Sequence, residues 1–307
     1  MLSDALVATR DGIVGYWKAD GTVPARAPQN LPDSDLMYLT PTYRGFVHDH
    51  ILSRAFGVTT SGPKSGDATV TLGKLNLIRI ERPADSVFVA QLQHLKTYAD
   101  LRAERISEVS VQIHDLISFF GALCHLDSGR RRHTLEALNT VQRLCFHVEF
   151  MVKHFCRAAR PVDLSSQVQP MIQTPSHSSY PNGHATEAFA LATVVHALLG
   201  GKDPAADMVK GTPEFRLAER IAANRIVAGV HFPVDTLAGA ALGVTIGRAF
   251  LALMTGTKLV SKGAAGGFKG HEDFNLAGAA ALLGKAVTGP GKDPVLADFW
   301  DHVKAEW

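Results

Sequence analysis

The sequence predicts an all-α protein, a bundle of six or more helices with an irregular N-terminal extension. Apolar residues recur at helical intervals from Pro83 onward, and prolines and glycines separate these periodic segments. Alternation of β-branched residues is confined to Ala68–Ile80, where one short β-hairpin fits. We expect residues 1–82 to form the extension, 83–262 a helical catalytic domain, and 263–307 a linker and a C-terminal helix on the same domain.

The helical elements follow one another along the chain. Two apolar stripes predict two helices, or one kinked helix, over residues 84–124. A long helix is expected from Thr134 to Ala159, and Pro161 ends it because proline disfavours helical geometry in the residue before it. The remaining predicted elements are helices at His184–Leu199, Pro213–Val230, Pro233–Met254 and Pro294–Trp307, with a flexible linker at Gly263–Gly270.

Composition argues for a globular protein and against several functional classes. Hydrophobic residues make up 46% and charged residues 20%, and 31 Lys and Arg nearly balance 29 Asp and Glu, leaving a net charge of +2. A nucleic-acid-binding domain would carry a clustered basic excess, so no nucleic-acid partner is expected. The three cysteines each lie in an apolar helical stretch, where a buried thiol is the ordinary role.

Signals for export or membrane insertion are not expected from the sequence. Residues 1–11 contain an early acid and no long apolar stretch, unlike a signal peptide. The most apolar stretch, residues 237–255, is rich in glycine and alanine and is interrupted by Arg248. This favours a tightly packed core helix over a transmembrane one. We therefore expect a soluble, cytoplasmic protein without a membrane partner.

Short polar clusters lie at the ends of three predicted helices. In the first, Lys153 and Arg160 are seven residues apart, so at 3.6 residues per turn they project from one helix face, about 20° apart. In the second, Gly183 permits close backbone approach, and His184 starts a helix whose free N–H groups favour an oxyanion. Taken singly, solvated cations and an ordinary turn with a capping histidine remain the simpler explanations.

The third cluster places Arg225 and His231 on either side of Gly229, with Asp235 in the first turn of the next helix. An Asp four residues after a His can accept its Nδ1–H and leave Nε2 free as a nucleophile or a ligand. Three cations and a ring of N–H donors together predict a pocket for a tetrahedral, phosphate-sized oxyanion.

The order and spacing of these residues resemble a known signature. The patterns K-x6-R-P, P-x-G-H and R-x5-H-x3-D, which here run from Lys153 to Asp235, are similar to those of the vanadium-dependent haloperoxidase and type 2 phosphatidic acid phosphatase (PAP2) superfamily. The resemblance implies a helical bundle of that type, and residues 1–130 contribute nothing to it. Two positions depart from the family pattern, because Asn182 and Asn224 stand where serines are usual.

The resemblance also implies roles for the residues. A haloperoxidase would bind vanadium through His231, use His184 as acid and base, and polarise peroxide with Lys153. Asp235 would orient His231, and His177 lies where the bromoperoxidase branch has a second histidine on the halide side. The vanadate cofactor, which phosphate or sulfate can replace, would be held by Lys153, Arg160, Asn182, Gly183, Arg225 and His231.

The leading hypothesis from sequence is therefore a vanadate-dependent haloperoxidase that oxidises bromide or iodide with hydrogen peroxide to hypohalous acid. His177 and the soluble character favour this branch. One alternative is a soluble acid phosphatase of the same superfamily, in which His231 would form a phosphohistidine and His184 would protonate the leaving group. A second is a non-catalytic oxyanion-binding protein, suggested by the two asparagines. The helix faces left over in residues 84–124 predict a homodimer or higher homo-oligomer.

Overall fold

The computed structural model describes residues 5, 9, 30–260 and 263–307. The chain divides into two units, residues 1–32 and 33–307, and the second contains all the helices and strands described below. The expectation of no signal peptide in residues 1–11 lies outside the described residues, apart from Ala5 and Thr9.

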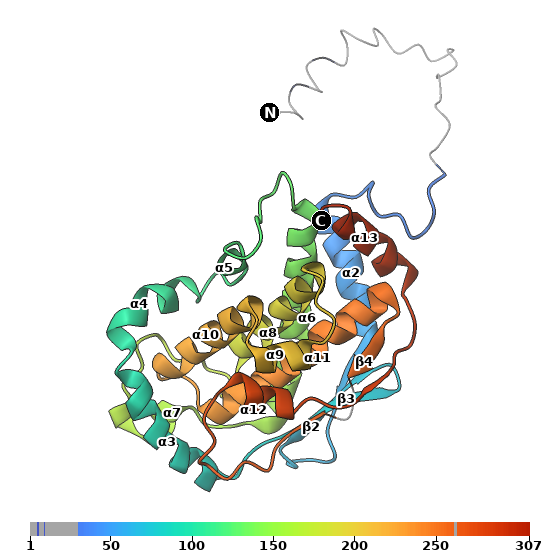
Figure 1. Ribbon diagram of the computed structural model, residues 1–307. Coiled ribbons are helices and arrows are strands. Elements are labelled where there is room, and N and C mark those ends of the chain that lie inside the picture. The colour runs from blue at the N-terminus through green and yellow to red at the C-terminus, as the bar shows by residue number, and fades with distance from the viewer. Residues whose placement is uncertain (1–4, 6–8, 10–29, 261–262) are drawn as a thin grey trace, which may run out of the picture. The chain divides into compact units, whose positions relative to one another are not determined.

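The second unit is built mainly from helices, as the sequence predicts (Figure 1). The α-helices are α2 (Pro41–Ala55), α3 (Asp85–Ala99), α4 (Arg102–Val111), α5 (Ile117–Phe120), α6 (Arg132–Cys156), α7 (Pro161–Leu164), α8 (Gly183–Leu198), α9 (Pro204–Lys210), α10 (Pro213–Val227), α11 (Pro233–Thr255), α12 (Leu276–Ala281) and α13 (Pro294–Lys304). A 3-10 turn follows α7 at Ser166–Val168. Six of these helices have proline in their first turn, where its missing N–H is not needed.

The prediction of an all-α fold is wrong in one respect, because the unit also contains a mixed four-stranded sheet. Its strand order is β1 (Phe56–Thr59), β2 (Asp67–Leu72), β3 (Leu75–Glu81) and β5 (Gly263–Ala265). The hairpin expected over Ala68–Ile80 is confirmed as the β2–β3 pair, and β1 extends it. Two further strands, β4 (Lys258–Val260) and β6 (Ala286–Thr288), form a separate antiparallel pair.

Two segments expected to be irregular are thus regular. Residues 41–81 form α2 and three strands, because Pro41 starts the helix and alternate β2 residues are buried, among them Ala68 and Val70. Gly263–Ala265, expected to begin a flexible linker, pairs in parallel with β3. The pairing joins segments about 180 positions apart, so no local sequence pattern announces it.

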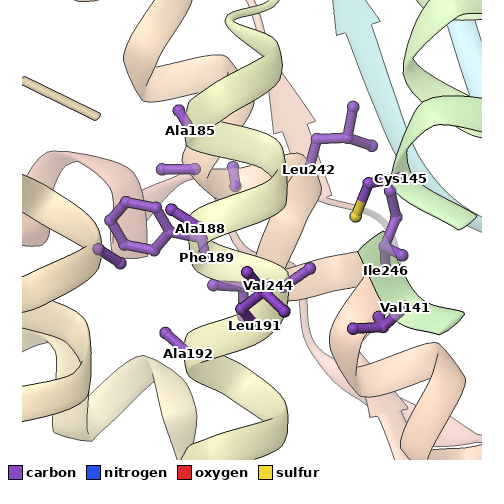
Figure 2. Close-up of a cluster of buried hydrophobic side chains, with 14 of the residues drawn as sticks. Val141, Cys145, Ala185, Ala188, Phe189, Leu191, Ala192, Leu242, Val244 and Ile246 are labelled. Atoms are coloured by element: carbon purple, nitrogen blue, oxygen red, sulfur yellow. The ribbon is translucent and has the colours of Figure 1, made fainter. Parts of the chain in front are cut away.

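Close packing of α8 against α11 forms the centre of the core (Figure 2). A Cβ added at Gly239 would lie 2.3 Å from the carbonyl oxygen of Asn182, and one at Gly243 would lie 2.2 Å from that of Thr186. Only glycine permits this approach. As a result, the two helix N-termini lie together, and the backbone N–H of Asn182 donates to the Asp235 carbonyl at 2.9 Å.

Helix α11 has a composition that bears on location. Within the part of the chain that the structure describes, it is the one helix long and apolar enough to cross a membrane. Eighty-nine per cent of its most apolar stretch is buried inside the protein. The cysteines Cys124, Cys145 and Cys156 are free and buried, as predicted.

Candidate active site

The three predicted clusters converge where helix ends meet. Lys153 lies in the last turn of α6, and Arg160 is the N-cap residue of α7. The prediction that both cations project from one helix face is wrong, because α6 ends at Cys156, before Arg160. His184 is in the first turn of α8, and His231 lies just before α11. Lys153, Arg160 and His231 are residues no more than 3% exposed, so their polar atoms are removed from bulk water.

His231 is oriented by a carboxylate, as the four-residue spacing predicts. Its Nδ1 lies 3.2 Å from Oδ2 of Asp235. The same Oδ2 accepts from the backbone N–H of Phe232 at 2.9 Å and from the hydroxyl of Ser179. Burial raises the pKa of Asp235 to about 6, while the Ser179 and Phe232 hydrogen bonds act against that rise. Asp235 is therefore mostly ionised at neutral pH and can hold the Nδ1 proton.

Arg160 covers the other nitrogen of this imidazole. Its Nη1 lies 2.9 Å from Nε2 of His231 and also donates to the Val230 carbonyl at 2.7 Å. A guanidinium only donates hydrogen bonds, so Nε2 must be the acceptor and carry the lone pair. Burial, followed by the charge of Arg160, lowers the pKa of His231 well below its usual range. The imidazole is neutral at physiological pH.

Lys153 and His177 line the entrance to this region. The ammonium group of Lys153 donates to the carbonyls of Ser178, at 3.3 Å, and Pro181. Nδ1 of His177 lies 3.2 Å from Nη2 of Arg160. Burial lowers the pKa of Lys153 to about 8 and that of His177 to about 4. Both side chains border a cleft of about 840 Å³, which also includes Arg160 in its lining.

Arg225 is nearly fully buried, and only one of its three guanidinium nitrogens has hydrogen-bond partners among the described residues. Its Nη2 donates to the Val109 carbonyl at 3.1 Å and to Oε1 of Gln112 at 3.0 Å. Nε and Nη1 are buried with no hydrogen-bond partner among the described residues. Burial lowers the pKa of the guanidinium to about 10, so it remains cationic at neutral pH. Two unpaired, buried, charged donors fit an oxyanion, because leaving such donors unbonded is costly.

His184 is held by the end of α4. Its Nε2 donates to the Gln112 carbonyl at 2.8 Å, so the neutral ring carries its proton there and leaves Nδ1 unprotonated. Burial, with the charge of Arg225 next, lowers the pKa of His184 to about 3. An anion bound among these cations would act in the opposite direction and raise it.

The two positions that depart from the family pattern serve as structural links. Oδ1 of Asn182 accepts the backbone N–H of Ala185 at 3.3 Å, and its Nδ2 donates to Thr236. Asn224 Nδ2 donates to Glu108 and Gln112, which ties α10 to α4. The oxyanion contact predicted for the Asn182 side chain thus competes with its bonds to both helix starts.

Sequence reasoning missed several groups around the site. Glu149 precedes Lys153 by one helical turn, and its Oε1 lies 2.6 Å from where a Cβ on Gly183 would be, so a larger residue there would displace the Glu149 carboxylate. Burial raises the pKa of Glu149 to about 7 and that of Glu187 to about 8. The i, i+4 spacing of Glu149 and Lys153 was a usable signal. Ser179 and Gln112 had no such signal, since the residues that they contact, Asp235 and Arg225, are far away in the sequence.

Part of the chain is similar to known proteins. Residues 137–258 match the model of the PAP2 superfamily. The chain is 32% identical over 100 residues to decaprenylphosphoryl-5-phosphoribose phosphatase of Mycobacterium tuberculosis, a match that covers 33% of this chain and 50% of that protein. The chain thus spans about half the length of this relative.

Two other relatives match shorter parts of their own sequences. Lipid A 1-phosphatase of Porphyromonas gingivalis is 37% identical over 71 residues, 23% of this chain and 15% of that protein. Vanadium-dependent bromoperoxidase of Ascophyllum nodosum is 36% identical over 94 residues, 24% of this chain and 17% of that protein. A crystal structure of a transmembrane PAP2 type phosphatidylglycerolphosphate phosphatase from Bacillus subtilis aligns over 67% of this chain and 92% of its own, at 17% identity and a TM-score of 0.26, too low to carry an argument.

These relatives correct the function predicted from sequence. The haloperoxidase hypothesis, with peroxide and halide as substrates, is wrong, because the phosphatase matches favour the phosphatase alternative. The bromoperoxidase match is a weak and partial one, so His177 does not identify that branch.

The predicted cytoplasmic location without a membrane partner is also wrong. Both phosphatase relatives are named for lipid substrates, a decaprenylphosphoryl sugar phosphate and lipid A. Helix α11 contains residues 237–255, where the interruption by Arg248 argued against a membrane span. The length and composition of the helix nevertheless suffice for one. A single arginine does not remove that capacity.

Proposed function

We propose, from the premise that the chain is a member of the PAP2 superfamily, that it is a phosphatase which hydrolyses phosphate monoesters through a phosphohistidine on His231. The proposal rests on the protonation state of the His231 imidazole. Nε2 holds an available lone pair at neutral pH. The charges of two buried cations, Arg160 and Lys153, act on this imidazole, and the charge of the buried Arg225 acts on His184. A nucleophile beside cations suits phosphoryl transfer, in which the protein mainly positions and stabilises charge.

In this account the phosphate oxygens are bound by the three cations. Arg225 supplies its unpaired Nε and Nη1, and Arg160 turns its Nη1 from His231 to a phosphate oxygen. Lys153 contributes a third positive charge. The free N–H groups at the start of α8 point at the same anion and add the favourable end of the helix dipole.

The first chemical step transfers the phosphoryl group to the protein. Nε2 of His231 attacks phosphorus, the P–N bond forms, and the P–O bond to the alcohol breaks with its electron pair on oxygen. Asp235 stabilises the positive charge that develops on the ring through Nδ1–H. The bound phosphate raises the pKa of His184, which then holds a second proton and delivers it to the leaving oxygen.

The second step returns His231 to its initial state. His184, now neutral, takes a proton from a water molecule as that water attacks phosphorus. The P–N bond breaks, its electron pair returns to Nε2, and inorganic phosphate leaves. The three cations again stabilise the charge on the transferring group.

The proposed substrate class is a phosphate monoester attached to a lipid-linked molecule. The names of the two phosphatase relatives support this class. Beside the cleft, α6 exposes three large apolar side chains, Phe146, Phe150 and Met151, and Phe150 lines the cleft itself. Exposed apolar groups at the mouth of a polar site suit a substrate with a hydrocarbon portion.

Vanadate enters this proposal as a competitor of phosphate. Orthovanadate has the same tetrahedral oxyanion shape, so the unpaired donors of Arg225 suit it as they suit phosphate. We expect vanadate, sequence-predicted as a resident cofactor, to inhibit hydrolysis competitively.

One experiment tests the proposed function against its alternatives. Purified protein is assayed for phosphate release from phosphatidic acid in detergent micelles, and separately for bromination of a phenolic dye with orthovanadate, peroxide and bromide. We expect phosphate release only, abolished by His231→Ala and retained by His114→Ala, which changes an exposed histidine. Tight phosphate binding without release would indicate a non-catalytic oxyanion-binding protein.

A further inference from the structure

A second cavity adjoins the cleft that leads to the candidate active site. It has a volume of about 540 Å³ and lies between the C-terminal end of α6 and the loop that joins β1 to β2. Lys64 of the loop lines it, together with His154 and Arg157 at the end of α6. His154 and Arg157 also line the larger cleft, so the two cavities adjoin at these two side chains.

The loop that carries Lys64 is held in place by hydrogen bonds to Asp67. The buried carboxylate of Asp67 accepts from the backbone N–H of Ser61 at 3.2 Å and from the hydroxyls of Ser61, Ser65 and Thr60. These hydrogen bonds, that of Ser65 first, lower the pKa of Asp67 to about 2, so the anchor persists across the physiological pH range. The loop is therefore a rigid part of the cavity wall.

Two cations that line the second cavity occupy strained backbone positions. Lys64 has a φ of 64° and Arg157 a φ of 48°, in the left-handed region that favours glycine. Arg157 sits at the C-cap of α6, where glycine is usual. A cation there also interacts with the helix dipole, but Lys153 and His154 already supply that in the last turn. Two long cationic side chains thus stand where glycine would cost less, which points to a role for their charge.

The charges that line the two cavities are nearly all of one sign. Lys64, Arg157, Lys153 and Arg160 are cationic, and among the described lining residues the carboxylates are represented by Asp163 alone. Asp163 accepts the backbone N–H of Arg160 at 2.8 Å and so is engaged in capping α7. Arg82 lines the second cavity too, but it is paired with Asp85. A wall of unpaired cations attracts an anion.

We propose that the second cavity is a subsite for a second phosphate group on the substrate, carried by the part of the molecule that leaves when its phosphomonoester is cleaved. Lys64 and Arg157 bind this group and so select substrates that have it. The subsite is formed by the N-terminal hairpin loop and the end of α6, and its loop lies outside the segment that matches the PAP2 family. This inference rests on the proposed phosphatase function.

The test compares two lipids with the same acyl chains in the same micelles at fixed ionic strength. Phosphatidic acid carries one phosphomonoester, whereas phosphatidylglycerol phosphate carries a phosphomonoester and, in addition, a phosphodiester anion. The quantity measured is the ratio of kcat/KM for the second lipid to that for the first. We expect a ratio of at least about 10 for the wild type, the equivalent of about 1.4 kcal/mol, which is within reach of one charge-assisted contact.

Glycine variants remove each cation without damage to the backbone. Lys64→Gly and Arg157→Gly relieve the positive-φ strain, so both are expected to fold. Each should lower the ratio at least about threefold, and the double variant should bring it close to one. Lys74→Gly, at the exposed turn at the other end of the β2–β3 hairpin, is the matched control and should leave the ratio unchanged.

The possible failures are distinguishable. Hydrolysis of neither lipid by the wild type would overturn the proposed function and the subsite with it. Hydrolysis of both with a ratio near one would overturn the subsite alone. The subsite would also be overturned if Lys74→Gly lowered the ratio as much as Lys64→Gly does, because the preference would then reflect general surface charge.

Discussion

Nη1 of Arg160 lies 2.9 Å from Nε2 of His231, and this contact determines the protonation of the imidazole. Because a guanidinium cannot accept a hydrogen bond, the lone pair of His231 must face Arg160 and its proton must lie on Nδ1, toward Asp235. In the proposed mechanism, Arg160 covers this lone pair until an anion takes the place of the imidazole. The same Nη1 donates to the Val230 carbonyl at 2.7 Å, which keeps the guanidinium in position.

Replacement of Arg160 should impair catalysis far more than folding. Arg160→Gln removes a cation that would bind the transferring phosphoryl group, so we expect kcat/KM for phosphatidic acid to fall by at least about 100-fold. Arg54→Gln, at an exposed position of α2, serves as the control and should be neutral. Retention of more than about a tenth of the wild-type kcat/KM would contradict a role of Arg160 in the reaction.

Ser179 should tune the pH dependence of the reaction. Its hydroxyl donates to Asp235 and lowers the pKa of that carboxyl, which burial has raised to about 6. In Ser179→Ala this pKa should rise further, so the acidic limb of the kcat/KM profile should move to higher pH. Ser110→Ala, an exposed serine, should leave the limb in place. If the acidic limb of Ser179→Ala were not shifted, the ionisation of Asp235 would not control the reaction.

Glu149 should make the protein less stable as pH rises. Its pKa is about 7 in the folded chain against an ordinary value of 4.5, so between these values the folded state holds a proton that the unfolded state has lost. The free energy of unfolding therefore decreases with pH across this window. In Glu149→Gln that decrease should be weaker, measured by urea denaturation at pH 5 and pH 8. An effect equal to that of the exposed control Glu104→Gln would refute this assignment.

His48 should destabilise the protein in acid. Its ring packs against Phe299 with centroids 4.5 Å apart, and both ring nitrogens are buried without a hydrogen-bond partner among the described residues. Burial lowers its pKa from 6.5 to about 4, so the unfolded state gains a proton first and stability falls as pH drops below 6.5. The gain in stability of His48→Leu over the wild type should grow from pH 7 to pH 5 by up to about 1.4 kcal/mol per unit.

The matched control for that measurement is His50→Leu, at an exposed position of the same helix. It should show no such growth. A constant difference between His48→Leu and the wild type over this pH range would mean that His48 does not titrate as its burial requires.

Local chemistry made much of the helical part predictable. Pro233 marks the start of α11, because proline's ring and missing N–H act within a few residues. Pro161 does not end α6 as expected, since that helix ends at Cys156, where Arg157 takes the left-handed conformation, and Pro161 instead begins α7. The β2–β3 hairpin was predictable because its alternation is also local. The β3–β5 pairing was not, since it depends on the three-dimensional path of the chain between Ile80 and Gly263.

In the candidate site, too, contacts between residues close in sequence were predictable and contacts between distant residues were not. His231 and Asp235 are four residues apart, so their contact follows from helix geometry. Ser179 reaches Asp235 over 56 positions and Gln112 reaches Arg225 over 113, and neither partner has a sequence pattern of its own. The motif could not distinguish a peroxidase from a phosphatase, because vanadate and phosphate require the same cations. The predicted domain boundaries and homo-oligomer stay predictions.

The most direct test of the central claim is detection of the covalent intermediate. Protein mixed with phosphatidic acid labelled with ³²P in its phosphate is denatured in alkali within milliseconds, digested and analysed by mass spectrometry. The account predicts one phosphoryl group on His231, stable to alkali and lost in acid, and absent from His231→Ala. Phosphate release by the wild type with no label on His231, or equal release by His231→Ala, would contradict it.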